Sequence, residues 1–84
     1  MSEDRYRPIP CALYSRYELA VLRGRPLTVV WRDEAGATHV DRLAPLDLET
    51  RAGAEYLVGR RVADGATCRL RLDRILRAQP LPER

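Results

Sequence analysis

Apolar residues recur at helical spacing near the start of the chain and at strand spacing after it. Over residues 11–23 they stand at i, i+4, i+7 and i+8, at Leu13, Tyr17, Ala20 and Val21. This spacing is typical of the buried face of an amphipathic helix. Gly24 and Pro26 follow, and both residue types commonly mark the end of a helix. We therefore expect one short helix over residues 11–23.

From residue 27 onward apolar and polar residues alternate, as in strands with one buried face. The first strand carries its apolar residues on one side, at Leu27, Val29 and Trp31. A turn over residues 33–36 leads to a second strand over residues 38–43. Pro45 interrupts the alternation, so residues 44–50 are expected to form a bend or a short irregular strand.

A hairpin is predicted between residues 55–62 and 67–73, around Asp64-Gly65. Asp-Gly is a strong hairpin signal because both positions of a tight turn need positive φ. With a two-residue turn, Arg60 would lie opposite Arg69 on the outer face. A last strand is expected over residues 75–78. The inside positions of the sheet are predicted to be Leu27, Val29, Trp31, Leu57, Leu70 and Leu72.

These elements predict a mainly β protein with one N-terminal α-helix. About five or more short antiparallel strands are too short for an open sheet with two solvated faces, so a small barrel or β-sandwich is expected. We expect a single domain over residues 1–84. It would comprise an extended arm at 1–10, anchored by Ile9, the helix at 11–23, the barrel at 27–79 and a tail at 80–84.

Composition adds little to this picture. The formal net charge is +3 and the pI is about 9.3, but twelve acidic residues are mixed among fifteen basic ones. Every basic residue is Arg, a bias that a GC-rich genome produces without selection for phosphate binding. No apolar run approaches the roughly 20 residues that span a bilayer. We expect a cytoplasmic protein with no membrane contact.

No catalytic or metal-binding motif stands out. His39 is the only histidine, and no Ser or Cys is placed by sequence to act with it. Cys11 and Cys68 are far apart and form no CxxC pair, so reduced thiols are expected. The sequence predicts no catalytic residue, no metal, no cofactor and no small-molecule substrate. The chain is expected to bind a partner rather than to be an enzyme.

Several segments together resemble the Rof family of Rho-binding antiterminators. They are Tyr6-Arg7-Pro8-Ile9-Pro10-Cys11, Tyr14, Glu18-Leu19-Ala20, Asp47-Leu48, Glu55-Tyr56-Leu57-Val58 and Arg69-Leu70-Arg71-Leu72-Asp73-Arg74-Ile75. The resemblance covers about residues 6–76. It implies a bacterial protein with an Sm-like barrel preceded by a helix. It also implies that transcription termination factor Rho is the partner, and that the protein occludes Rho's primary RNA site and so inhibits Rho-dependent termination.

By this resemblance the Rho-binding surface comprises one side of the helix and one loop. The residues are Ser15, Arg16, Glu18 and Leu19 on the helix and Thr50, Arg51, Ala52 and Gly53 in the loop.

Two other functions remain open. An Sm-like module could bind RNA directly through Arg60, Arg69 and Arg71 on the outer face of the hairpin, with Trp31 or Tyr56 as stacking residues. The chain could also be an adaptor that keeps the fold with a different partner.

Overall fold

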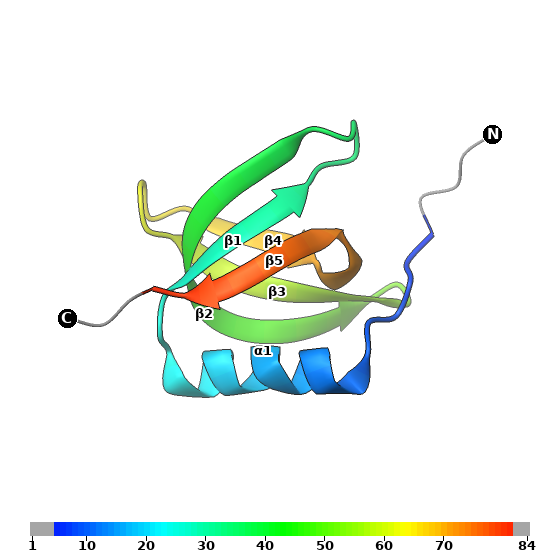
Figure 1. The fold of residues 1–84 in the computed structure, drawn as a ribbon, viewed down its shortest axis with the longest axis horizontal. Helices are drawn as coiled ribbons and strands as arrows, with labels where there is room; N and C mark the ends of the chain where they lie inside the picture. The colour runs from blue at the N-terminus through cyan, green and yellow to red at the C-terminus, as the bar shows by residue number, and fades with distance from the viewer. Residues whose placement is uncertain (1–4, 82–84) are drawn as a thin grey trace.

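The computed structural model describes residues 5–81 and contains one helix and five strands (Figure 1). The elements in chain order are α1 (Cys11–Arg23), β1 (Leu27–Arg32), β2 (Thr38–Arg51), β3 (Ala54–Arg61), β4 (Thr67–Arg71), the short 3-10 helix η1 (Leu72–Arg74) and β5 (Ile75–Pro80). The mainly β composition and the single helix are as predicted.

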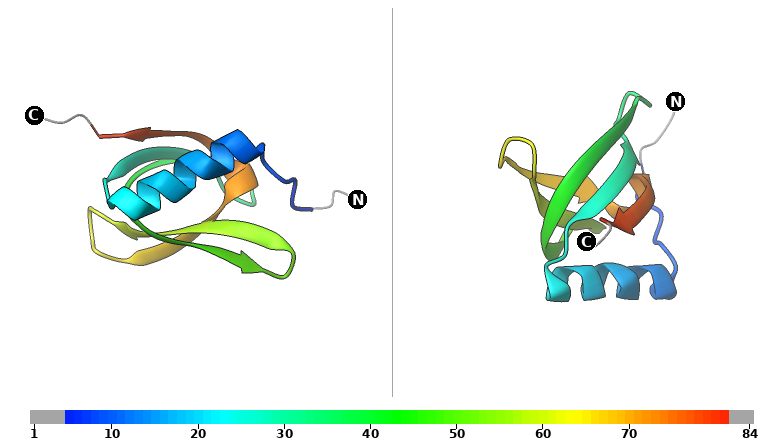
Figure 2. Two further views of the ribbon diagram at one scale, coloured as in Figure 1. Left: turned by 90° about the horizontal axis from the view of Figure 1, so that it is seen from below. Right: turned by 60° about the vertical axis from the view of Figure 1, so that its left-hand side comes forward.

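Helix α1 ends at the predicted glycine. Gly24 has φ of 65°, in the left-handed region, and its N–H donates to the carbonyls of Ala20 and Val21. This cap gives hydrogen-bond donors to carbonyls that would otherwise have none in the last turn of the helix. Tyr17 is the buried residue of the helix and packs into the core. Figure 2 shows α1 lying across one end of the curved sheet.

The five strands form one antiparallel sheet in the order β4-β3-β2-β1-β5. The sheet is strongly bent (Figure 2), but β4 and β5 do not pair with each other within residues 5–81. The expectation of a closed Sm-like barrel therefore needs correction to an open, curved sheet. Strands β4 and β5 are therefore its two edges.

The second strand is longer than predicted, because the stretch expected to be a bend or a short irregular strand, residues 44–50, continues it with an irregularity. β2 is a single strand of 14 residues, and its pairing with β3 shifts register between Pro45 and Asp47. Pro45 has no N–H to donate to a ladder, and a bulge at Leu46 lets the strand bend past it and resume pairing. Proline here bends the strand without ending it.

The predicted β3–β4 hairpin is present, but its loop is longer than two residues. Among the residues described, Ala52 is the one non-glycine with positive φ, so Asp64 does not adopt the conformation that a two-residue turn requires. Residues 62–66 form the loop, closed by a bond from the N–H of Arg61 to the carbonyl of Ala66. As a result, Arg60 lies opposite Thr67, and the expected Arg60–Arg69 pairing was wrong.

The core lies inside the bend of the sheet and beneath α1. Its buried members are Tyr17, Leu27, Val29, Leu43, Leu57, Leu70 and Leu72. Five of the six predicted inside residues are buried, whereas Trp31 is half-buried and packs at the margin of this cluster. Trp31 therefore remains accessible, and it lines the cleft described below.

The described part of the arm, residues 5–10, has no regular secondary structure. Ile9 packs against the core as predicted, and Tyr6 does so as well. The remainder of the arm (1–4) and most of the predicted tail (82–84) lie outside the described residues, while Pro80 belongs to β5.

Within the described chain, no helix is long and apolar enough to cross a bilayer.

Truncating a core leucine tests the burial pattern. Leu70 is 5% exposed, so Leu70→Ala is expected to lower the free energy of unfolding by about 2–5 kcal/mol. Leu22→Ala removes the same atoms from a residue that is 81% exposed and is expected to change stability little. Chemical denaturation measures both; equal effects of the two substitutions would contradict the assignment.

Candidate functional site

A cleft opens between residues of β1, β3, β4 and η1. Its volume is about 370 Å³, within the roughly 300–1,000 Å³ typical of small-molecule sites. The lining residues are Trp31, Glu34, Tyr56, Arg69, Leu70, Arg71 and Arg74. They come from β1 and the turn after it, from β3, from β4 and from η1. The bend of the sheet thus brings residues of β1 close to residues of β3, β4 and η1.

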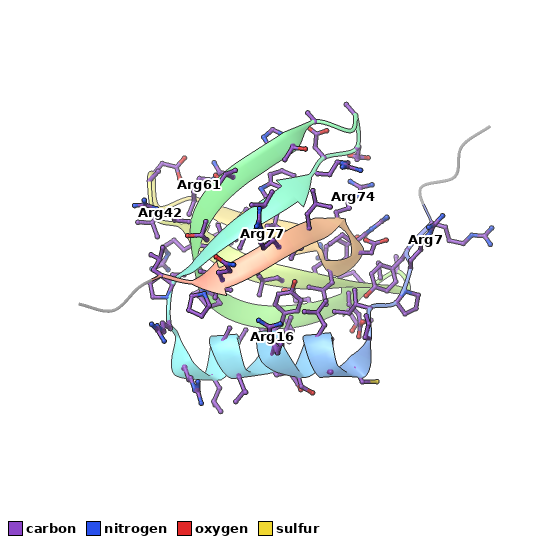
Figure 3. All side chains as sticks on the ribbon, in the orientation of Figure 1. Arg7, Arg16, Arg42, Arg61, Arg74 and Arg77 are labelled. Atoms are coloured by element: carbon purple, nitrogen blue, oxygen red, sulfur yellow. The ribbon has the colours of Figure 1, made fainter. Side chains whose placement is uncertain are left out.

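A second hollow, of about 360 Å³, adjoins the cleft and shares Glu34, Arg71 and Arg74 with it. Its other lining residues are Arg5, Arg7, Arg32, Asp33, Gly36, Asp73 and Leu76. Figure 3 shows Arg7 and Arg74 at the same end of the molecule. Six arginines and three carboxylates line the two hollows, and this excess of positive charge attracts anions.

Arg71 is held rigidly at the boundary of the two hollows. Its Nε and Nη2 donate to the two carboxylate oxygens of Asp73, at 2.6 and 3.0 Å. Its guanidinium carbon lies 5.9 Å from the ring centroid of Tyr6, a cation–π distance. Both partners of the Arg71–Asp73 pair are largely buried, so a planar charged group is presented in one orientation.

Arg69 is tethered from the neighbouring strands. Its Nε donates to Glu49 Oε1 at 2.9 Å, across β3 from β4 to β2. The hydrogen bond from Arg69 lowers the pKa of the Glu49 carboxyl. Tyr56 lies between these strands, opposite Arg71 on β4 and Glu49 on β2. The aromatic and charged groups on this side of the cleft thus hold one another in place.

On the opposite side, Trp31 is fixed by a chain of contacts. Its Nε1–H donates to Asp41 Oδ2 at 2.8 Å, and its ring stacks on His39 with centroids 4.5 Å apart. His39 Nε2 is 2.7 Å from Asp33 Oδ2, and the hydrogen bond with His39 lowers the pKa of Asp33. The single histidine thus has a structural role, which is to support the tryptophan.

The N-terminal arm lines the second hollow through Arg5 and Arg7. The Tyr6 hydroxyl donates to Glu55 Oε1 at 2.9 Å, and the backbone N–H of Arg7 donates to Asp73 Oδ2 at 2.9 Å. Burial, followed by the adjacent Glu55 carboxylate, raises the pKa of Tyr6. Asp73 therefore orients Arg71 and anchors the arm at once.

The structure separates the residues predicted to bind Rho into two groups. Ser15, Arg16, Glu18 and Leu19 are exposed on α1, and Thr50, Arg51, Ala52 and Gly53 are exposed at the β2–β3 turn. Arg16 and Leu19 line a separate groove beside α1, which the turn residues do not reach. None of the eight lines the cleft.

Of the residues predicted for the RNA alternative, Arg69 and Arg71 line the cleft with Trp31 and Tyr56, whereas Arg60 does not. Sequence reasoning missed Arg74, Tyr6 and Arg7. Arg74 follows Asp73 directly and lines both hollows. No local signal placed the arm beside residues more than 45 positions away.

The described residues contain no group of three or more His, Cys, Asp or Glu that could hold a metal ion. Both cysteines are free. Burial raises the pKa of the Cys68 thiol, which disfavours a reactive thiolate.

The sequence profile of the WYL domain matches residues 13–80. The match covers most of the chain, which therefore belongs to the WYL domain family. It begins within α1 and ends at the last residue of β5, so it includes all five strands.

Among solved structures, the fold is similar to Proteasome accessory factor B/C (PafBC) of Arthrobacter aurescens, with a TM-score of 0.77 and 17% sequence identity. The match covers 95% of this chain but 13% of that one, so this chain spans about an eighth of the length of PafBC. No curated protein matches the sequence with significance.

These findings correct the expectation of a Rof-type antiterminator, which was wrong. The chain matches the WYL domain over residues 13–80, and the segments Glu55–Val58 and Arg69–Ile75 that resembled the Rof pattern fall on β3 and on the β4–η1–β5 connection of this fold. Because the family assignment was wrong, the prediction of Rho as the partner is wrong as well. The alternative of a direct RNA-binding Sm-like module has no support from these comparisons either.

Removing the acceptor of the Trp31 hydrogen bond tests how the cleft wall is held. Asp41→Ala leaves the half-buried indole N–H without its partner and is expected to lower stability by about 1–3 kcal/mol. Asp41→Asn retains an acceptor oxygen and is expected to lose less. Denaturation gives the free energies, and emission of the only tryptophan reports the environment of its ring. If both variants match the native protein, this bond does not hold Trp31.

The Glu49–Arg69 pair predicts a specific acid sensitivity. Because the folded-state pKa of Glu49 lies below its ordinary value of 4.5, its stabilising contribution is present above that pH and is lost as the pH falls through the lowered pKa. Glu49→Gln is expected to make stability less dependent on pH in this range. Arg69→Gln should remove the same component, and the double variant should add nothing further. Additive effects in thermal unfolding at pH 3–6 would contradict coupling between the pair.

Proposed function

We propose that this chain is a regulatory, ligand-sensing module of a transcription regulator, and that its ligand is a small anion bound in the arginine-rich cleft. Membership of the WYL domain family supports a regulatory role. The similarity to PafBC over a small fraction of that protein supports the idea that such a module works within a larger regulator.

The observation that carries the proposal is the convergence of three arginines and two aromatic rings on one cleft. Arg69, Arg71 and Arg74 supply planar donors suited to carboxylate or phosphate oxygens. Trp31 and Tyr56 supply flat apolar surface against which the rest of a ligand can pack. Concave sites with a few convergent polar groups are typical ligand sites.

Binding without catalysis is the role we propose for this site. Arginine remains protonated and transfers no proton near neutral pH, while the nearby carboxylates Asp73 and Glu49 are engaged by Arg71 and Arg69. His39 is stacked on Trp31 and bonded to Asp33, so its ring serves the cleft wall. These groups orient an anion, and a change in the rim is the means by which occupancy would be signalled.

A fluorescence titration tests the proposal. Trp31 lines the cleft and is the only tryptophan, so a ligand that enters should change its emission. Inorganic phosphate, citrate and adenosine monophosphate, with adenosine as the uncharged control, sample anions of different size and aromatic content. Arg74→Ala is expected to weaken binding of the responding anion about tenfold or more, the usual effect of losing a charge-assisted hydrogen bond.

Arg77→Ala is the matched control, because Arg77 is exposed on β5 and lines neither hollow. It removes the same charge and should leave the affinity nearly unchanged. Equal losses in the two variants would show a general charge effect. No response to any anion, or an equal response to adenosine, would overturn the assignment of the cleft as an anion site.

A further inference from the structure

A groove beside α1 is separate from the cleft. It lies between the helix, the start of β1 and the end of β5, and its volume is about 190 Å³. Its floor is apolar, formed by Leu13, Tyr17, Ala20, Leu27 and Ala78. Cavities of about 150 Å³ accept a benzene-sized molecule, so this groove has room for a bulky aliphatic side chain.

The charged side chains that line the groove are all positive. Arg16, Arg23 and Arg25 line it, and among the described residues no Asp or Glu does. The end of α1 contributes a partial negative charge of about half a unit, which three guanidinium groups outweigh. Figure 3 shows Arg16 rising from α1 toward the sheet.

Apolar side chains extend the groove onto the helix surface. Leu19 lines the groove and is 46% exposed, and Leu22, one turn further along, is 81% exposed. Residues at i and i+3 lie on the same helix face. One edge of the groove is also held in place, because Arg25 Nη2 donates to the Leu81 carbonyl at 3.0 Å and the Leu81 N–H donates to the Pro26 carbonyl at 3.0 Å.

We infer that this groove is a docking surface for an acidic, leucine-bearing segment of a protein partner. A leucine side chain fills the apolar floor, and flanking carboxylates pair with Arg16 and Arg23. An acidic segment fits because the rim offers only cations, and an apolar anchor fits because the floor offers no polar side chain besides Tyr17. A basic segment would face three like charges at close range.

This docking surface is distinct from the ligand cleft and does not depend on it. Along the β1–β5 pair, Leu27 and Pro80 stand at the groove end, whereas Trp31 and Ile75 stand at the cleft end. Partner and ligand can therefore occupy the molecule together.

The test uses fluorescence anisotropy with a labelled synthetic peptide, Glu-Glu-Leu-Leu-Glu-Glu, acetylated and amidated at its ends. We expect saturable binding that is lost when alanines replace the two leucines or lysines replace the four glutamates. Leu19→Asp and Arg23→Gln are each expected to weaken binding about tenfold. Circular dichroism confirms that each variant keeps its fold, and Arg16→Gln provides a second rim variant if Arg23→Gln unfolds α1.

Two control variants distinguish docking in the groove from charge attraction elsewhere on the surface. Arg77→Gln removes one positive charge from the exposed side of β5 and should not change the affinity; a loss equal to that of Arg23→Gln would overturn the proposal as general charge attraction. Arg74→Ala, which disables the proposed ligand cleft, should also leave peptide binding intact, so the two proposals fail separately. Binding of the alanine peptide as tightly as the leucine peptide would overturn the docking proposal. The docking proposal would also be overturned if the protein self-associates through this surface, which would be shown by self-association that Leu19→Asp abolishes and that the peptide does not displace.

Discussion

The three-residue connection between β4 and β5 is the constraint on which the rest of the structure depends. These strands occupy opposite edges of a five-stranded sheet. In a flat sheet the edges would lie about 19 Å apart, because neighbouring strands are separated by about 4.8 Å. The chain from Arg71 to Ile75 can span at most about 14 Å even when fully extended, and here it forms η1. The sheet must therefore curl until its edges approach each other at η1.

The same turn determines what lies on each side of the backbone at this point. Leu72 is 1% exposed and points into the core, while Arg71, Asp73 and Arg74 line the hollows. Burial of one leucine thus fixes the turn whose neighbours form the cleft. The pairing of Arg71 with Asp73 completes this arrangement, because an unpaired charge with so little exposure would cost several kcal/mol.

Local patterns were sufficient for most elements but not for the site. The helix could be predicted because its apolar periodicity ends at Val21 and is followed by Gly24 and Pro26. The core strands could be predicted because apolar and polar residues alternate along them. The continuation of β2 past Pro45 could not be predicted, because only the pairing with β3 shows that the strand resumes after the bulge. Trp31 has the spacing of a core residue, and its place at the margin follows from its bond to Asp41 across the β1–β2 pair. A cleft made from β1, β3, β4 and η1, next to a hollow that the arm lines, depends on tertiary contacts that no local pattern contains.

The arm gives the site a different relation to folding from that of the core. Its two hydrogen bonds, Tyr6 to Glu55 and Arg7 to Asp73, join residues 49 and 66 positions apart; the first is part-buried and the second is exposed. Contacts of this kind close late and open first, at a free energy well below that of global unfolding. Amide hydrogen exchange is therefore expected to be slow for the strands and fast for the arm. The side of the second hollow that the arm forms is thus held by a few contacts of its own, separate from the strand pairings that hold the sheet.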